Sequence, residues 1–116
     1  MKIAHYRDSI SDYQSFQLGD FELQCGKKLP NAQIAYKTLG KLNVDKSNVI
    51  ILNHPVVGTH ESAESINLDR ENRAISPEKH FIIMPNKFGN GLSSSPSNTS
   101  APFAGSSFPS VTILTV

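Results

Sequence analysis

The feature that most constrains this chain is a short apolar run, Val49-Ile50-Ile51-Leu52, that breaks abruptly into Asn53-His54-Pro55. So short a run, rich in β-branched residues, predicts a strand that is buried on both faces. Polar groups and a tight turn at the carboxyl end of such a strand are where open α/β sheets place their chemistry. We therefore expect residues 49–52 to form a central strand and the loop after it to belong to the functional site.

A second apolar run, over residues 80–85, predicts another buried strand. The polar segment between the two strands favours a helix around residues 67–74, which Ser76-Pro77 would stop. The order strand, helix, strand predicts a parallel βαβ unit with a right-handed crossover.

Apolar and polar residues alternate in two segments before these elements, over residues 16–25 and 33–39. They predict an antiparallel hairpin with its turn over residues 26–31. The alternation slips by one position at Gly19, which indicates a bulge. Cys25 falls in the alternating pattern and is interpreted as a small core residue rather than a reactive thiol.

Residues 86–110 are rich in Gly, Ser and Pro, a composition typical of a flexible linker. Four apolar side chains, those of Phe88, Leu92, Phe103 and Phe108, are interleaved with them. Linkers seldom carry that much apolar area, so we expect an ordered surface loop that these side chains pack.

The charge balance excludes some partners. The 116 residues include 11 basic and 10 acidic side chains, for a net charge of +1. No electrostatic footprint for a nucleic acid or an anionic membrane follows from that balance. The single cysteine allows no intramolecular disulfide, and the first residues have no apolar signal-peptide region. We expect a cytoplasmic protein with neither nucleic-acid nor membrane partners.

Serine catalysis is the first chemistry to consider. A nucleophile elbow needs Gly-x-Ser-x-Gly, and the nearest match, residues 91–95, lacks the second glycine. The α/β-hydrolase order places the histidine after the nucleophile, yet no histidine follows His80. Ser93 is therefore interpreted as a loop serine rather than a nucleophile.

Metal and phosphate sites are the next alternatives. His54, His60 and Glu61 are close in sequence, but the spacing of the two histidines matches no common ligand pattern. The Gly89-Asn90-Gly91 segment is a glycine-rich turn, yet it lacks the remaining residues of a phosphate-binding fingerprint. We expect no bound metal and no bound cofactor.

The remaining candidate for a functional group is the backbone of the loop after Leu52. A turn at a strand end can aim N–H groups at a developing oxyanion. In an α/β hydrolase one such donor comes from the loop after strand three. If the hairpin supplies strands one and two, then residues 49–52 are strand three, and the loop from His54 to Gly58 stands in that place. A plain structural turn is the alternative interpretation.

Several stretches, taken in order, resemble one known family. They are residues 34–43, residues 53–60 (Asn-His-Pro-Val-Val-Gly-Thr-His), residues 75–86, and residues 88–98 together with 108–113. Their order and spacing are similar to the N-terminal part of the homoserine O-acetyltransferase family, whose members have the α/β-hydrolase fold. The resemblance covers about residues 16 to 113. The family also holds relatives described only as α/β hydrolases.

The resemblance implies acyl transfer in methionine biosynthesis. In that chemistry a serine takes an acyl group from acyl-CoA and passes it to the hydroxyl of homoserine, with a histidine as base and an aspartate that orients it. All three residues are expected beyond Val116, so the resemblance implies no catalytic residue in this chain and no activity for the chain alone.

What the resemblance does place in this chain is the loop after strand three. Val56 matches the oxyanion donor, through its backbone N–H. The residues that would shape the loop around it are Asn53, His54, Gly58 and Thr59. Pro55 and Val57 replace the usual Ala and Thr of the acyltransferases, which leaves an esterase or other hydrolase as an alternative.

The expected fold is therefore α/β: an N-terminal fragment of an α/β-hydrolase fold, with an antiparallel opening hairpin and then parallel strands joined by a crossover helix. Residues 1–14 are expected to form a flexible lead-in, and residues 15–116 a partial domain truncated before the nucleophile elbow. The parent protein would use acyl-CoA as co-substrate and a small-molecule acceptor. Its expected partners are a missing C-terminal part or a second copy, and a non-catalytic interaction fragment is the alternative of another class.

Overall fold

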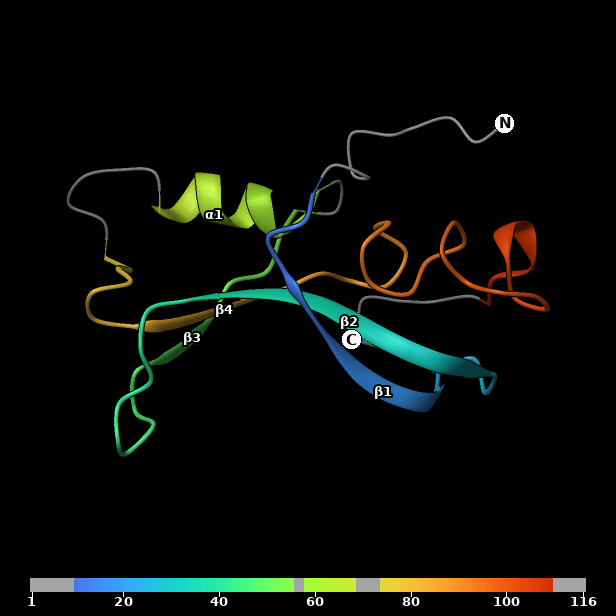
Figure 1. The fold of residues 1–116 in the computed structure, drawn as a ribbon, viewed down its shortest axis with the longest axis horizontal. Helices are drawn as coiled ribbons and strands as arrows, with labels where there is room; N and C mark the ends of the chain where they lie inside the picture. The colour runs from blue at the N-terminus through green and yellow to red at the C-terminus, as the bar shows by residue number, and fades with distance from the viewer. Residues whose placement is uncertain (1–9, 56–57, 69–73, 110–116) are drawn as a thin grey trace.

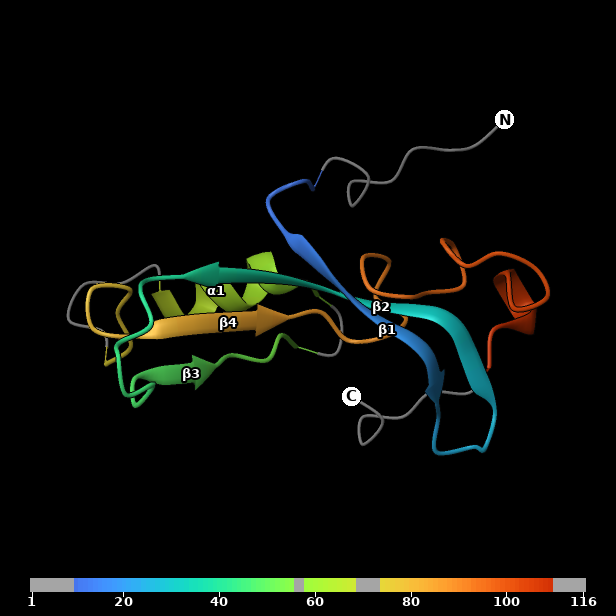
Figure 2. The ribbon, with the colours of Figure 1, turned by 60° about the horizontal axis from the view of Figure 1, so that its bottom comes forward.

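The computed structural model describes residues 10–55, 58–68 and 74–109. These residues form a four-stranded sheet with a helix over one face (Figures 1 and 2). In chain order the elements are β1 (Gln14–Glu22), β2 (Lys28–Leu39), β3 (Val49–Ile51), α1 (His60–Leu68), β4 (Phe81–Pro85) and a 3-10 turn at Gly105–Ser107. The strand order is β1-β2-β4-β3. The predicted fold class, a hairpin followed by parallel strands and a crossover helix, is confirmed.

Strands β1 and β2 pair antiparallel, as the alternating patterns predict. Their register shifts on either side of Gly19, which adopts a φ of 68° and confirms the expected bulge. The turn is tighter than predicted, because β2 already begins at Lys28. Cys25 consequently lies in the turn and is exposed, so its interpretation as a core residue is wrong.

The helix begins earlier than the sequence pattern predicts. Thr59 caps it: the carbonyl oxygen of Thr59 accepts from the N–H of Ser62 at 3.0 Å, and its hydroxyl accepts from the N–H of Glu61 at 3.2 Å. The prediction of residues 67–74 is thus wrong at its start, since α1 spans His60–Leu68. Residues 69–73 of that prediction lie outside the described residues, and residue 74 is not helical.

Strand β3 pairs parallel with β4, which confirms the βαβ unit, but it is not central. β4 lies between β2 and β3, so β3 has one neighbour in the described sheet. Ile50 packs on the core beneath α1, whereas Val49 and Ile51 are 40% and 60% exposed on the other face. The prediction of a strand buried on both faces is therefore wrong for this chain.

Apolar side chains form three clusters along the sheet. The first lies between the sheet and α1, the second between the hairpin and the loop after β4, and the third joins Ile10, Ala35 and Leu92. Phe88 and Phe108 belong to the second cluster, which confirms that residues 86–109 form an ordered loop packed by its own apolar residues. Phe103 is half-buried.

Residues 10–13 also pack against the sheet, although they belong to the segment assigned to a flexible lead-in. Ile10 is buried, and the ring of Tyr13 lies 5.9 Å from the ring of His60. The division into residues 1–14 and 15–116 stays a prediction. The helices of the described ranges fall short of the length and apolarity that a membrane crossing requires.

Candidate functional site

Three segments meet at the carboxyl ends of the parallel strands: the loop after β3, the start of α1 and the loop after β4. Asn86, directly after β4, lies at their centre and is fully buried. Its Oδ1 accepts from the backbone N–H of His60 at 2.9 Å, which fixes the orientation of the amide. Its Nδ2 donates to the carbonyl of Ala35 and to Nδ1 of His60, both at 3.0 Å. A single amide thus joins β2, β4 and the first residue of α1.

His54 anchors the loop after β3. The backbone N–H of Lys87 donates to Nε2 of His54 at 3.0 Å, so this nitrogen carries no proton. Nδ1 therefore holds the proton and donates to the carbonyl of Pro55 at 2.6 Å. Nζ of Lys87 also donates to the backbone carbonyl of His54 at 3.0 Å. The backbone and side chain of one residue of the β4 loop thereby hold the first residues of the β3 loop.

His60, the first residue of α1, is buried and has the other tautomer. Because Nδ1 accepts from Asn86, the proton is on Nε2, which donates to Oδ1 of Asp12 at 3.0 Å. Asp12 also pairs with Nζ of Lys37 at 2.8 Å, and Lys37 pairs with Glu64 of α1 at the same distance. A network of charged and hydrogen-bonded side chains therefore links the segment before β1 to the sheet and the helix.

This charged network shifts the pKa values of Asp12 and Lys37. The hydrogen bonds from Lys37 and then from His60 lower the pKa of Asp12 to about 2. Burial lowers the pKa of Lys37, but its hydrogen bonds to Asp12 and Glu64 outweigh that effect and leave the pKa above its ordinary value.

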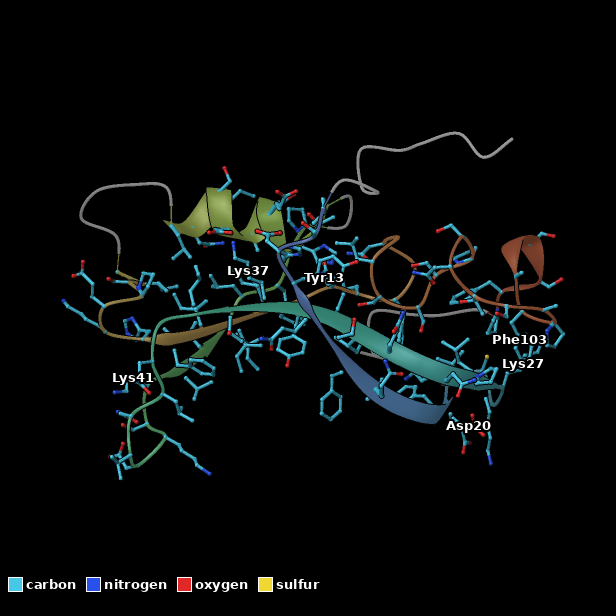
Figure 3. The ribbon with its side chains drawn as sticks, viewed as in Figure 1. Tyr13, Asp20, Lys27, Lys37, Lys41 and Phe103 are labelled. Carbon is cyan, nitrogen blue, oxygen red and sulfur yellow. The ribbon has the colours of Figure 1, made fainter. Side chains whose placement is uncertain are left out.

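Figure 3 labels Lys37 and Tyr13 on the side of the sheet that carries α1, where both line a shallow hollow.

The serines of the β4 loop are structural. Ser93 is fully buried, and its hydroxyl donates to the carbonyl of Asn86 at 2.6 Å and accepts from the N–H of Ala35 at 2.8 Å. Ser94 accepts from the N–H of Gln33 at 2.9 Å in the same way. These bonds dock the loop on the part of β2 that β4 does not cover, so the interpretation of Ser93 as a loop serine agrees with its contacts.

The predicted site residues divide between this network and the surface. His54, Gly58 and Thr59 are buried in it, whereas Asn53 is exposed. A Cβ added to Gly58 would lie 2.8 Å from the hydroxyl of Ser62, so the loop approaches α1 closely there. Val56, the proposed oxyanion donor, lies outside the described residues.

The residues weighed as metal ligands do not converge. His54 and His60 bond to different partners, and Glu61 is exposed. Within residues 10–55, 58–68 and 74–109 no three His, Cys, Asp or Glu side chains are grouped to hold a metal ion.

The described site is a scaffold of backbone and amide groups. In this part of the chain, no serine or cysteine side chain forms a hydrogen bond to a histidine ring, so it holds no assembled nucleophile and base. Sequence reasoning missed Asn86 and Asn90 as members of the site. The available signal was an asparagine placed directly after a buried strand, a polar group that must be satisfied there.

Known proteins resemble this chain in both sequence and structure, although no protein-family model matches it. It is 40% identical over 113 residues to an ethyl acetate hydrolase of Pseudomonas veronii, an alignment that covers 97% of this chain and 32% of that protein. It is 36% identical over 112 residues to a homoserine O-acetyltransferase of Chlorobaculum parvum, covering 91% of this chain and 31% of that protein. The chain thus spans about a third of the length of these relatives.

Among solved structures, the acetyl esterase MekB superposes with a TM-score of 0.84 at 36% identity, over 94% of this chain and 31% of that one. The sheet and these superpositions define the chain as a part of the α/β-hydrolase fold, matching the N-terminal portion of such proteins. Its homologues include both esterases and homoserine O-acetyltransferases.

Proposed function

We propose that this chain supplies the oxyanion side of an acyl-transfer site in an α/β-hydrolase-fold enzyme, and that the reaction is hydrolysis of a short-chain acyl ester. The observation that carries the proposal is the buried anchoring of the β3 exit loop through His54 and Gly58, in a chain whose relatives at 40% identity include an ethyl acetate hydrolase. A loop held in this manner is suited to present backbone N–H groups in a fixed direction.

In the proposed mechanism the backbone N–H of Val56 donates to the oxyanion of the tetrahedral intermediate. The serine nucleophile, the histidine base and the orienting aspartate belong to the part of the enzyme that follows Val116. The histidine takes the serine proton during attack and returns it to the departing alcohol, and water then releases the acyl group. The anchoring of the loop matters because the oxyanion hole acts only when its donors are already oriented.

Acyl transfer from acyl-CoA to homoserine is the second candidate. It is favoured by the homoserine O-acetyltransferase homologues, one of them 36% identical. The two reactions share the acyl-serine and differ in the acceptor, which is water in one and an alcohol in the other. Pro55 and Val57, which stand where the acyltransferases usually have Ala and Thr, favour the esterase.

Two chimeric enzymes separate the candidates. In the first, residues 10–109 replace the matching segment of the Pseudomonas veronii ethyl acetate hydrolase, and acetate release from ethyl acetate is measured. In the second, they replace the matching segment of the Chlorobaculum parvum homoserine O-acetyltransferase, and homoserine-dependent release of CoA from acetyl-CoA is measured. We expect turnover by the first chimera and none by the second.

The unmodified parent enzymes are the positive controls, and circular dichroism verifies that both chimeras fold. Turnover by the second chimera alone would move the assignment to acyl transfer. Two folded chimeras that turn over neither substrate would refute a role in acyl-group chemistry altogether.

A further inference from the structure

In the function proposed above, the Gly89-Asn90-Gly91 turn supplies no group to the oxyanion itself. The glycines adopt φ values of 88° and 98°, a left-handed conformation that side chains disfavour. The resulting turn directs Asn90 inward, where it is 7% exposed. An amide buried at the tip of a glycine turn must find partners for its polar atoms, and those partners show what the turn does.

The two ends of the Asn90 amide contact different parts of the molecule. Its Oδ1 accepts from the N–H groups of Leu92 at 3.0 Å and Ser93 at 3.4 Å, within its own loop. These donors fix the orientation of the amide. Its Nδ2 donates to Oδ1 of Asn86 at 2.8 Å and reaches the carbonyl of Gly58 at 3.4 Å.

The same Nδ2 also lies 3.4 Å from Nε2 of His54. His54 and Gly58 flank the segment that the proposed function uses as oxyanion donor. The side-chain oxygen of Asn90 therefore accepts hydrogen bonds only within the β4 loop, as far as the described residues show, whereas its nitrogen contacts His54 and Gly58 at the two ends of the β3 loop.

We propose that Asn90 is a positioning residue for the loop after β3: its Nδ2, held by Asn86, fixes His54 and Gly58, the two residues that flank the proposed oxyanion donor. The inference rests on the proposed function for its meaning, because an oxyanion donor needs a fixed direction. It does not depend on that function for its test, which is made on the chain itself.

The test uses Asn90→Asp, with Asn98→Asp, at an exposed amide of the same loop, as the control. Asn90→Asp keeps the oxygen that accepts from Leu92 and Ser93 but replaces the bridging donor with an acceptor. Asn98 has the same pattern within the β4 loop: its Oδ1 accepts from the N–H of Ser95 at 2.8 Å, and its Nδ2 donates to the carbonyl of Ser93 at 3.0 Å. Within the described residues, the hydrogen bonds of the Asn98 side chain all stay inside the β4 loop.

Two signals are measured by NMR at neutral pH: the ring ¹⁵N shifts of His54 and the hydrogen exchange of the Lys87 amide. In the unmodified chain we expect a proton on Nδ1 only and a slowly exchanging amide. In Asn90→Asp we expect Nε2 to gain proton character beside the new carboxylate, and the Lys87 amide to exchange about tenfold faster or more. In Asn98→Asp both signals should stay as in the unmodified chain.

Unchanged signals in Asn90→Asp, or equal changes in both variants, would overturn the inference. If Asn90→Asp does not fold, Asn90→Ala carries the same test without a buried charge, and there the Lys87 amide should exchange about tenfold faster or more. A chimera inactive in the ester assay, combined with the expected NMR changes, would refute the proposed function and leave the positioning role standing.

Discussion

Replacing Asn86 with alanine tests whether the buried amide holds the three segments together. The change removes four hydrogen bonds. In the variant, the carbonyl of Ala35 still accepts a hydrogen bond from the backbone N–H of residue 86 at 2.8 Å, and Nδ2 of Asn90 still donates to the carbonyl of Gly58. The N–H and the Nδ1 of His60 lose the partners described above. Because a buried group without a partner costs about 1–3 kcal/mol, we expect a loss of about 4 kcal/mol in the free energy of unfolding.

That loss is large against the total stability of a domain of this size, about 5–15 kcal/mol. The assay is urea denaturation followed by far-UV circular dichroism, since the chain has no tryptophan. With a slope of about 2 kcal/mol per molar urea, the midpoint should fall by about 2 M.

The control is Asn43→Ala. Asn43 also forms side-chain hydrogen bonds, accepting from the N–H of Ser47 and donating to its hydroxyl, both at 2.9 Å, but it is exposed and water can replace them. We expect a loss of about 0.5–1 kcal/mol for this variant. A loss in Asn86→Ala no larger than in Asn43→Ala would refute the reasoning that the buried amide fastens the site.

Three further predictions concern the same frame. The pKa of Asp12 is lowered from 3.8 to about 2, mainly by the hydrogen bond from Lys37. The ionised carboxylate therefore adds its full share to the free energy of unfolding above about pH 4, and that share is lost as the pH falls through 2. Because its side chain is 48% exposed and screened, Asp12→Asn should remove only about 1 kcal/mol at pH 7 and flatten the unfolding free energy between pH 4 and 2, as urea titrations would show. Gly40→Ala should prevent folding or lower the free energy of unfolding by more than about 3 kcal/mol, because its Cβ would overlap two backbone carbonyl oxygens. Gly26→Ala is the control, since Gly26 has a similar φ of 89° and open space around it, and it should cost about 1 kcal/mol. Thermal melts compare the two variants. Ser93→Ala should cost about 2 kcal/mol by urea denaturation and leave ester turnover by the esterase chimera at half or more of its value, and a loss of all turnover with the fold intact would contradict its structural assignment.

Local patterns were sufficient for much of the fold. The alternation around Gly19 predicted the hairpin and its bulge, and the two apolar runs predicted the parallel pair. The start of α1 was missed because its apolar stripe is weak, although Thr59 followed by Glu61 is a capping signal that could have placed it. Exposure of β3 could not be predicted, because it depends on β4 lying between β2 and β3, a non-local pairing.

The site was predicted in position but not in its working parts. The loop after β3 was found because a buried strand ending in polar residues has a known place in α/β sheets. Asn86 and Asn90 were missed because they act on groups far away in the sequence: Asn86 bonds Ala35 and His60, and Asn90 reaches Gly58. No periodicity in a single sequence encodes such partners, and only the requirement that buried amides be satisfied points to them.

Strand β2 contributes to all three apolar clusters, with Leu29 and Ala32 in one, Ala35 in the next and Leu39 packed on the third. It therefore sets the distance between the hairpin tip and the site. Residues added in pairs at the tip would lengthen the hairpin beyond the cluster that holds Leu29 and Ala32, and would leave the site in place. A single residue inserted between Ala32 and Leu39 would turn every later side chain to the opposite face. Length variation among descendants of this chain should consequently gather at the tip.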